Sequence, residues 1–224
     1  RGPEHVLDGG SDLYAALLHG ETIDRASILE GLGTTWFGTT AQFKYYPCAH
    51  VIQPFIDAIL AIVREHKIAA ADIQSIQCRI APWAAAIVAE PRAAKLRFDT
   101  ELEAIASLPY QLAVAVIERR VGLDALTLDA RRRADYRALA ERVTHVSDPS
   151  LGRGFDGHVA LATTTGRRFE LAATTAAPDP HKLREKFIGM VTPLASASEA
   201  AALALRLQSS RDWRIAVDAL DGGR

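Results

Sequence analysis

The chain has 224 residues, of which 49% are hydrophobic and 24% charged, and its 26 basic and 27 acidic side chains give a net charge of −1. This composition is typical of a globular protein with one or two cores, and the balanced charge argues against a nucleic-acid or membrane-surface binder. The longest apolar run, 51–63, is interrupted by polar residues and is shorter than the about 20 residues of a membrane span.

The cysteines and the chain start set further expectations. Cys48 and Cys78 have no zinc-ligand spacing, and no signal peptide is visible. We therefore expect no metal and a cytoplasmic location. The chain opens at Arg1 and its single methionine is Met190, so we expect it to be part of a longer protein.

Two short helices and a strand are predicted before residue 44. Ser11 and Asp12 can cap the first helix, and Asp24 can cap a second that runs to Glu30. Both are too short to be stable alone and must pack on something. The aromatic and β-branched content of 36–43 predicts a strand.

The turn at 44–50 brings a lysine, two tyrosines, a cysteine and a histidine close together in the sequence. Apolar residues from Ile52 onward have helical spacing, so a helix begins near Gln53 with Pro54 in its first turn. Lys44 and His50 then lie ahead of a helix N-terminus, where backbone donors favour an anion. This arrangement suits a carboxylate. The alternative is that Lys44 is a solvated surface residue and His50 a polar group flanking the helix.

A second capped helix is predicted after the strand 73–80. Ser107 can cap the helix 108–120, which Gly122 ends and which is apolar nearly all round. Tyr110 lies at its N-terminal end. Its phenol either serves a site there or packs in the core with its hydroxyl satisfied.

The remaining elements follow in order. The arginine-rich segment 129–141 is predicted to be a surface helix whose charges form a solvated face. The glycine-rich segment 152–157 lacks the Lys and Ser/Thr of a phosphate loop and is predicted to be flexible. Strands are predicted at 142–147, 158–163 and 168–173, the last two joined as a hairpin, and helices from Asp179, from Ser196 or Ser198, and over 212–220.

The pattern as a whole predicts an α+β protein. We expect a helical segment at 1–34, a mixed helix and strand domain at 35–176, and C-terminal helices at 177–224 that pack with a separate helical layer.

Three segments resemble motifs of the MmgE/PrpD family, which includes 2-methylcitrate dehydratase, cis-aconitate decarboxylase and iminodisuccinate epimerase. They are Phe-Lys-Tyr-Tyr-Pro-Cys at 43–48 with Phe-Ile-Asp-Ala at 55–58, Ser-Leu-Pro-Tyr at 107–110, and Asp-Pro-His-Lys-Leu at 179–183 with Lys-Phe at 186–187. The resemblance spans almost the whole chain.

The resemblance implies a C-terminal half. Family members carry an additional N-terminal helical half, so 35–176 would be the lid domain and 177–224 helices that pack with the missing half. It also implies a cofactor-free enzyme that acts on small di- and tricarboxylates in the cleft between the two domains, and a homodimer.

The resemblance also implies the site residues. Lys44 would be the active-site lysine and Tyr110 the active-site tyrosine, with Ser107, Cys48 and Gln53 contacting substrate. Gln53 stands where the family usually has a histidine, and His50 is the nearby candidate to replace it.

A dehydratase, for example of 2-methylcitrate, is the expected function, incomplete in this chain alone. The alternatives are a decarboxylase, an epimerase of a substituted succinate, and a catalytically silent subunit that pairs with a separately encoded helical half.

Overall fold

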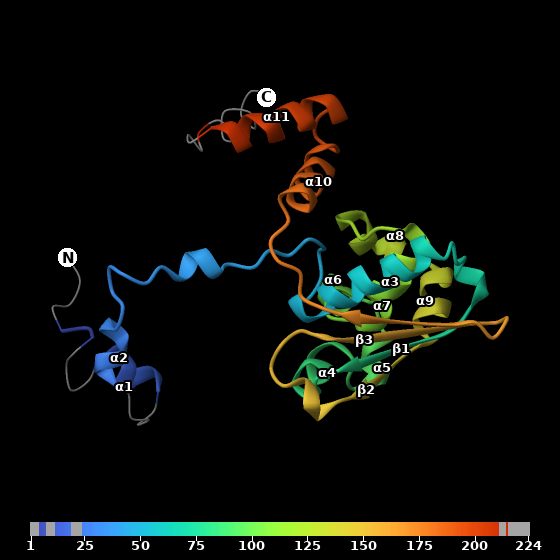
Figure 1. Ribbon diagram of the computed structural model, residues 1–224, viewed down its shortest axis with the longest axis horizontal. Helices are drawn as coiled ribbons and strands as arrows, with labels where there is room; N and C mark the ends of the chain where they lie inside the picture. Colours follow the sequence, from blue (N-terminus) through green and yellow to red (C-terminus); the bar gives the residue numbers. More distant parts are fainter. Residues whose placement is uncertain (1–4, 8–11, 19–23, 211–213, 215–224) are drawn as a thin grey trace. The chain divides into compact units, whose positions relative to one another are not determined.

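The computed structural model describes residues 5–7, 12–18, 24–210 and 214, and the chain divides into two compact units, Arg1–Ala41 and Gln42–Arg224 (Figure 1). The first unit holds α1 (Leu13–Leu17), α2 (Arg25–Leu29) and the 3-10 turn η1 (Phe37–Thr40). As predicted, the Asp12 and Asp24 side chains cap the two helices, accepting from the amides of Ala15 and Ala26.

The predicted strand at 36–43 is wrong. Residues 37–40 form η1, and the Thr39 and Thr40 hydroxyls donate to the carbonyls of Trp36 and Phe37, three residues back. Threonine side chains that bond to nearby carbonyls close a local turn in place of a strand ladder.

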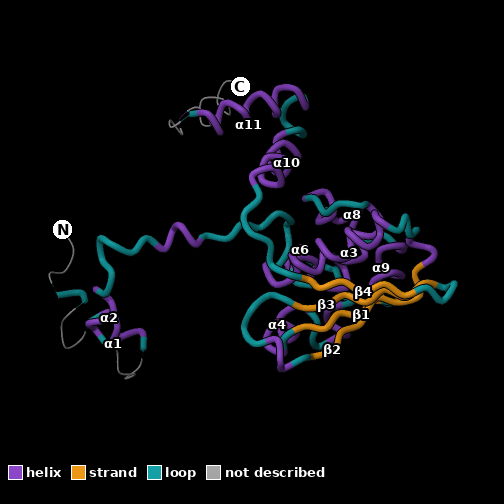
Figure 2. Tube along the Cα trace, in the orientation of Figure 1, coloured by secondary structure: helices purple, strands orange, loops and turns teal. Residues whose placement is uncertain are grey.

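The second unit carries a four-stranded mixed sheet and confirms the α+β prediction (Figure 2). The strand order is β2-β1-β3-β4, with β1 and β2 parallel and the other pairs antiparallel. The strands are β1 (Ile73–Ile80), β2 (Val143–Ser147), β3 (Gly157–Thr163) and β4 (Arg168–Ala173), and the helices are α3 (Gln53–Glu65), α4 (Pro82–Val88), α5 (Arg92–Lys95), α6 (Glu101–Ile105), α7 (Leu108–Glu118), α8 (Leu128–Arg131), α9 (Ala134–Ala140), α10 (Pro180–Val191) and α11 (Ala197–Ser209).

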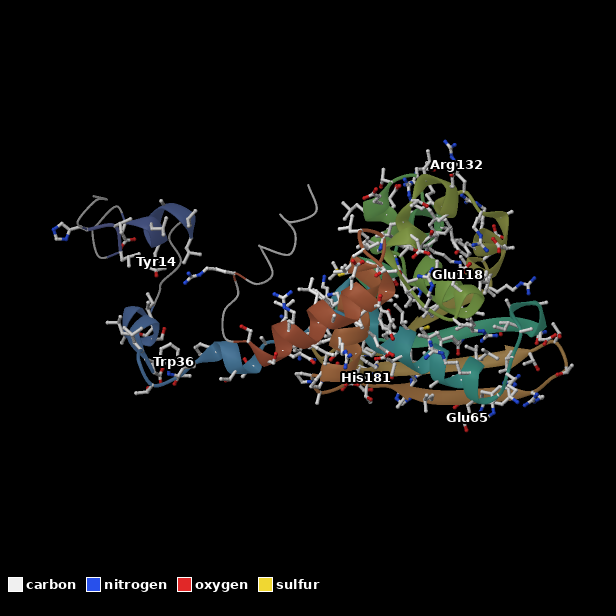
Figure 3. The ribbon with its side chains drawn as sticks, turned by 90° about the horizontal axis from the view of Figure 1, so that it is seen from above. Tyr14, Trp36, Glu65, Glu118, Arg132 and His181 are labelled. Carbon is white, nitrogen blue, oxygen red and sulfur yellow. The ribbon has the colours of Figure 1, made fainter. Side chains whose placement is uncertain are left out.

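The core lies between one face of the sheet and the helices α3 and α7, whose C-terminal ends are marked by Glu65 and Glu118 in Figure 3. Ile76, Cys78 and Ile80 alternate toward this core along β1, as the period of two predicts. Only glycine fits at position 157, because a Cβ there would lie 2.5 Å from the ring of Phe55.

Two helix predictions need correction. The segment 129–141 is two helices, α8 and α9, because the backbone of Arg133 is extended and caps the start of α9. Arg131 turns inward: it is buried, and its guanidinium donates to the carbonyls of Leu126, Phe98 and Asp99. The predicted solvated arginine face is therefore wrong at Arg131. Helix α7 ends at Glu118, and its C-cap Arg119 has a left-handed φ of 59°, ahead of the predicted stop at Gly122.

The C-terminal helices begin where their caps predict. Asp179 accepts from the amides of His181 and Lys182 at the start of α10, and Ser196 forms a capping box with Glu199 at the start of α11. The predicted helix 212–220 lies outside the described residues apart from Arg214. Among the described residues, no helix is long and apolar enough to cross a membrane. The three-part division of the chain stays a prediction.

Candidate functional site

The turn ahead of α3 is held together by one amide side chain. Gln53 Oε1 accepts from the backbone amides of Tyr45 and Tyr46 at 2.9 and 3.1 Å, and Gln53 Nε2 donates to the Tyr46 carbonyl at 2.9 Å and to Cys48 Sγ at 3.0 Å. A glutamine amide offers two acceptor lone pairs and two protons. All four are used inside the turn, so Gln53 fixes its backbone.

Cys48 belongs to the same buried end of the turn. Burial raises the pKa of its thiol to about 12, although the charge of Lys44 and the hydrogen bond from Gln53 both act to lower it. A thiol with this pKa stays protonated at neutral pH and is a poor nucleophile. Its place in the structure is therefore that of a packing residue and hydrogen-bond acceptor.

Helix α10 holds the turn from the other side. Lys182 Nζ lies 2.8 Å from Asp57 Oδ1, and the same carboxylate oxygen accepts from the Tyr46 hydroxyl at 2.6 Å. Lys186 Nζ donates to the carbonyl of Lys44 at 2.7 Å. The turn is thus fastened to α3 and to a helix more than a hundred residues later in the chain.

A pocket opens beside this turn, between the start of α3 and the segment that follows β4. It encloses about 410 Å³, including the open solvent at its mouth. Aromatic rings and small polar groups line it, and the His50 ring packs on Phe155 with a centroid distance of 4.8 Å. The lining residues are Gln42, Phe43, Tyr45, His50, Gln53, Pro54, Asp57, Phe155, Thr174, Thr175, Ala176 and Pro178.

The electrostatics of the turn couple Lys44 to His50. Lys44 is exposed, and His50 is half-buried. Burial lowers the pKa of His50 below its usual 6.5, and the positive charge of Lys44 lowers it further. The exposed Lys44 cation therefore acts on the His50 imidazole, which lines the pocket, while Lys44 itself is not one of the lining residues.

Tyr110 and Ser107 lie elsewhere. The Tyr110 side chain is fully buried, and its hydroxyl donates to the carbonyl of Ala125 at 2.5 Å, where burial raises the phenol pKa to about 12. Ser107 Oγ accepts from the Tyr110 amide and donates to the Lys95 carbonyl. Both side chains have protein partners, and neither lines the pocket. Their catalytic and binding roles stay predictions.

The structure thus brings Lys44, Cys48, His50 and Gln53 together and adds residues that sequence reasoning missed. Asp57 could have been found, because it lies one turn after Gln53 on the same helix face. Tyr45 could not, since the partner of its hydroxyl is the amide of Asp179. Within the described part of the chain, no group of three or more His, Cys, Asp or Glu could hold a metal ion.

One measurement tests the coupling of Lys44 to His50. We expect Lys44→Met to raise the pKa of the His50 imidazole without restoring it fully to 6.5, because burial is the larger cause. A folded-state pKa below the unfolded one contributes stability at high pH that is lost as the pH falls through the folded-state pKa. The His50 ring signals in an NMR titration give this pKa. Lys67→Met, at the far end of α3, is the control, and an equal shift in both variants would contradict the coupling.

Comparisons with known proteins bear on the same segment. The family model described as the MmgE/PrpD C-terminal domain matches residues 46–210. The match begins inside the turn, just after Lys44 and Tyr45, and runs through the sheet to the end of α11. No curated protein matches the chain.

Proposed function

The chain belongs to the MmgE/PrpD family, as its motifs predicted, and on that premise we propose that it supplies the lid part of a cofactor-independent lyase. The proposed reaction is the removal of water from a small di- or tricarboxylate such as 2-methylcitrate. Because its other acid and base groups would come from a helical half, this chain alone would have little activity.

The observation that supports this proposal is that His50 lies in the pocket wall, where burial and then the charge of the neighbouring Lys44 lower the pKa of its imidazole. Loss of a proton next to a carboxylate places negative charge on that carboxylate, and a fixed cation stabilises the charge as it develops. An imidazole that is unprotonated at pH 7 can accept a proton. Lys44 is proposed to bind the carboxylate, and His50 to act as the acid or base.

The surroundings of the pocket fit a site that is completed by another domain. The pocket is open to solvent, and Met190 on α10, Leu194 in the connection to α11 and Leu205 on α11 are exposed. We propose that the N-terminal helical half, from the same or a separate chain, covers these residues, and that the assembly is a homodimer. Both cysteines are free and buried, which fits a reducing cytoplasm.

The glutamine at position 53 bears on the alternatives to a dehydratase. An amide side chain does not titrate near neutral pH, so Gln53 cannot act as the acid or base that a histidine supplies, and its four hydrogen bonds are used in the turn. This favours, over a standard dehydratase, either an epimerase, which needs no leaving group, or a silent subunit. A decarboxylase would also use Lys44 to stabilise developing charge.

The proposal is tested with the chain alone and with the protein completed by the helical half encoded in frame upstream or as a separate partner. We expect the completed protein to dehydrate 2-methylcitrate and the chain alone to show little turnover. Absorbance of the new double bond measures dehydration, released CO₂ measures decarboxylation, and optical rotation measures epimerisation.

Each other outcome assigns a different function. Full turnover by the 224-residue chain would contradict its incompleteness. Release of CO₂ or a change in optical rotation without double-bond formation would replace the dehydratase by one of the other reactions. An inactive completed protein would leave the silent subunit.

A further inference from the structure

The unit Gln42–Arg224 contains four tyrosines, and their hydroxyls are used differently. Tyr46 donates its proton to Asp57, Tyr110 donates to the Ala125 carbonyl, and Tyr136 donates to Glu118. Tyr45 does the reverse: its hydroxyl oxygen accepts from the amide of Asp179 at 2.7 Å. Among the described residues, the Tyr45 proton has no acceptor.

The side chain that keeps this proton available lines the pocket. Tyr45 and His50 both contribute to its wall, and the Tyr45 amide is fixed by Gln53 at 2.9 Å. Backbone and hydroxyl are therefore both anchored, one by α3 and the other by the first turn of α10. A donor held in place in this way loses little freedom when it binds a ligand.

The charges near Tyr45 favour an anionic acceptor. Lys182 Nζ lies 5.3 Å from the centre of the Tyr45 ring, but its charge is paired with Asp57. Lys44 precedes Tyr45 in the chain and forms no ion pair with a described residue, so its charge remains for an anion. The nearby carboxylate of Asp57 is already bonded to Tyr46 and Lys182. When a backbone amide donates to a hydroxyl oxygen, it polarises the hydroxyl, and the hydroxyl becomes a stronger hydrogen-bond donor.

We infer that Tyr45 is a substrate-binding residue whose hydroxyl donates a hydrogen bond to a carboxylate of the acid in this pocket, beside Lys44. The inference rests on the proposed function and deepens it. The sequence predicted that Tyr110 supplies the phenol donor, but its hydroxyl donates to the Ala125 carbonyl. We assign this role to Tyr45 instead.

Binding of 2-methylcitrate to the full chain, followed by NMR with glycerol as the uncharged control, tests the assignment. Tyr45→Phe should weaken binding by about 10-fold or more, on the scale of a hydrogen bond to a charged group. Tyr136→Phe, which removes a hydroxyl bonded to Glu118, is the matched control and should change binding less than about 2-fold.

A second measurement separates binding from the support that Tyr45 gives to Asp179. With tyrosines labelled at the ring carbon that bears the hydroxyl, addition of the acid should shift the Tyr45 signal of the unaltered chain more than those of Tyr46, Tyr110 and Tyr136. A purely structural Tyr45 would show no such selective shift.

The outcomes distinguish the inference from the function on which it rests. If Lys44→Met weakens binding and Tyr45→Phe does not, the Tyr45 assignment is wrong and the carboxylate site stands. If Tyr110→Phe alone weakens binding, Tyr110 is the donor. If the unaltered chain does not bind the acid, the same variants are compared in the protein completed by the helical half. If that protein does not bind the acid either, the Tyr45 assignment and the proposed carboxylate site fall together.

Discussion

Replacing Lys44 by methionine in the complete protein is expected to lower turnover by about 100-fold or more, the scale of losing one donor to a developing oxyanion. Lys44 is exposed, and its charge reaches His50 at the pocket. Methionine keeps an unbranched apolar side chain of similar length and removes the ammonium group. Steady-state kinetics with the accepted acid measure the change.

The control is Lys67→Met, which removes an exposed lysine just after the C-terminal end of α3 and should leave turnover unchanged. Lys44→Arg keeps the charge and should retain part of the activity. A loss confined to kcat would place Lys44 in the transition state, whereas a rise in KM alone would indicate uniform binding of the acid. An unchanged kcat/KM in Lys44→Met would remove Lys44 from the mechanism.

Gln53→Leu is expected to lower the free energy of unfolding by about 3 kcal/mol, because it leaves two backbone amides of a partly buried turn without partners. The amides of Tyr45 and Tyr46 lose the bonds that Gln53 supplies, whereas the Tyr46 carbonyl keeps the Cys48 amide as a donor. Urea unfolding followed by circular dichroism measures the change.

Gln77→Leu is the matched control, since Gln77 is an exposed glutamine in the middle of β1, and its effect should stay within about 0.5 kcal/mol. Gln53→Glu keeps the acceptor oxygens and loses the donors to Tyr46 and Cys48, so it should be destabilised as well. A loss below about 1 kcal/mol in Gln53→Leu would mean that water replaces the amide and that the turn does not depend on it.

The predicted elements that proved right are those with local causes. The alternation along 73–80 gave β1 with its bounds, and the caps Ser107, Asp179 and Ser196 gave three helix starts. The segment 36–43 has strand propensity, but a strand also needs a partner, and none of the described strands pairs with these residues. The inward turn of Arg131 depends on carbonyls about 30 residues away, which helical periodicity cannot reveal.

The residues of the site also differ in whether their causes are local in the sequence. Lys44 and His50 were found because they precede a helix in the sequence, and the structure keeps them together at one turn. The use of each tyrosine hydroxyl was beyond sequence reasoning, because the partners of Tyr45 and Tyr110 lie 134 and 15 residues away.

The fastening of the turn by α10 has a consequence for the order in which the site assembles. Gln53 bonds to residues at most 8 positions away, so the turn can form as soon as that short segment is made. Asp179, Lys182 and Lys186 reach back 125 to 142 positions, and contacts of such separation form late. During synthesis the turn would therefore form before its contacts with α10. The Tyr45 hydroxyl would be oriented by the Asp179 amide only after α10 has left the ribosome.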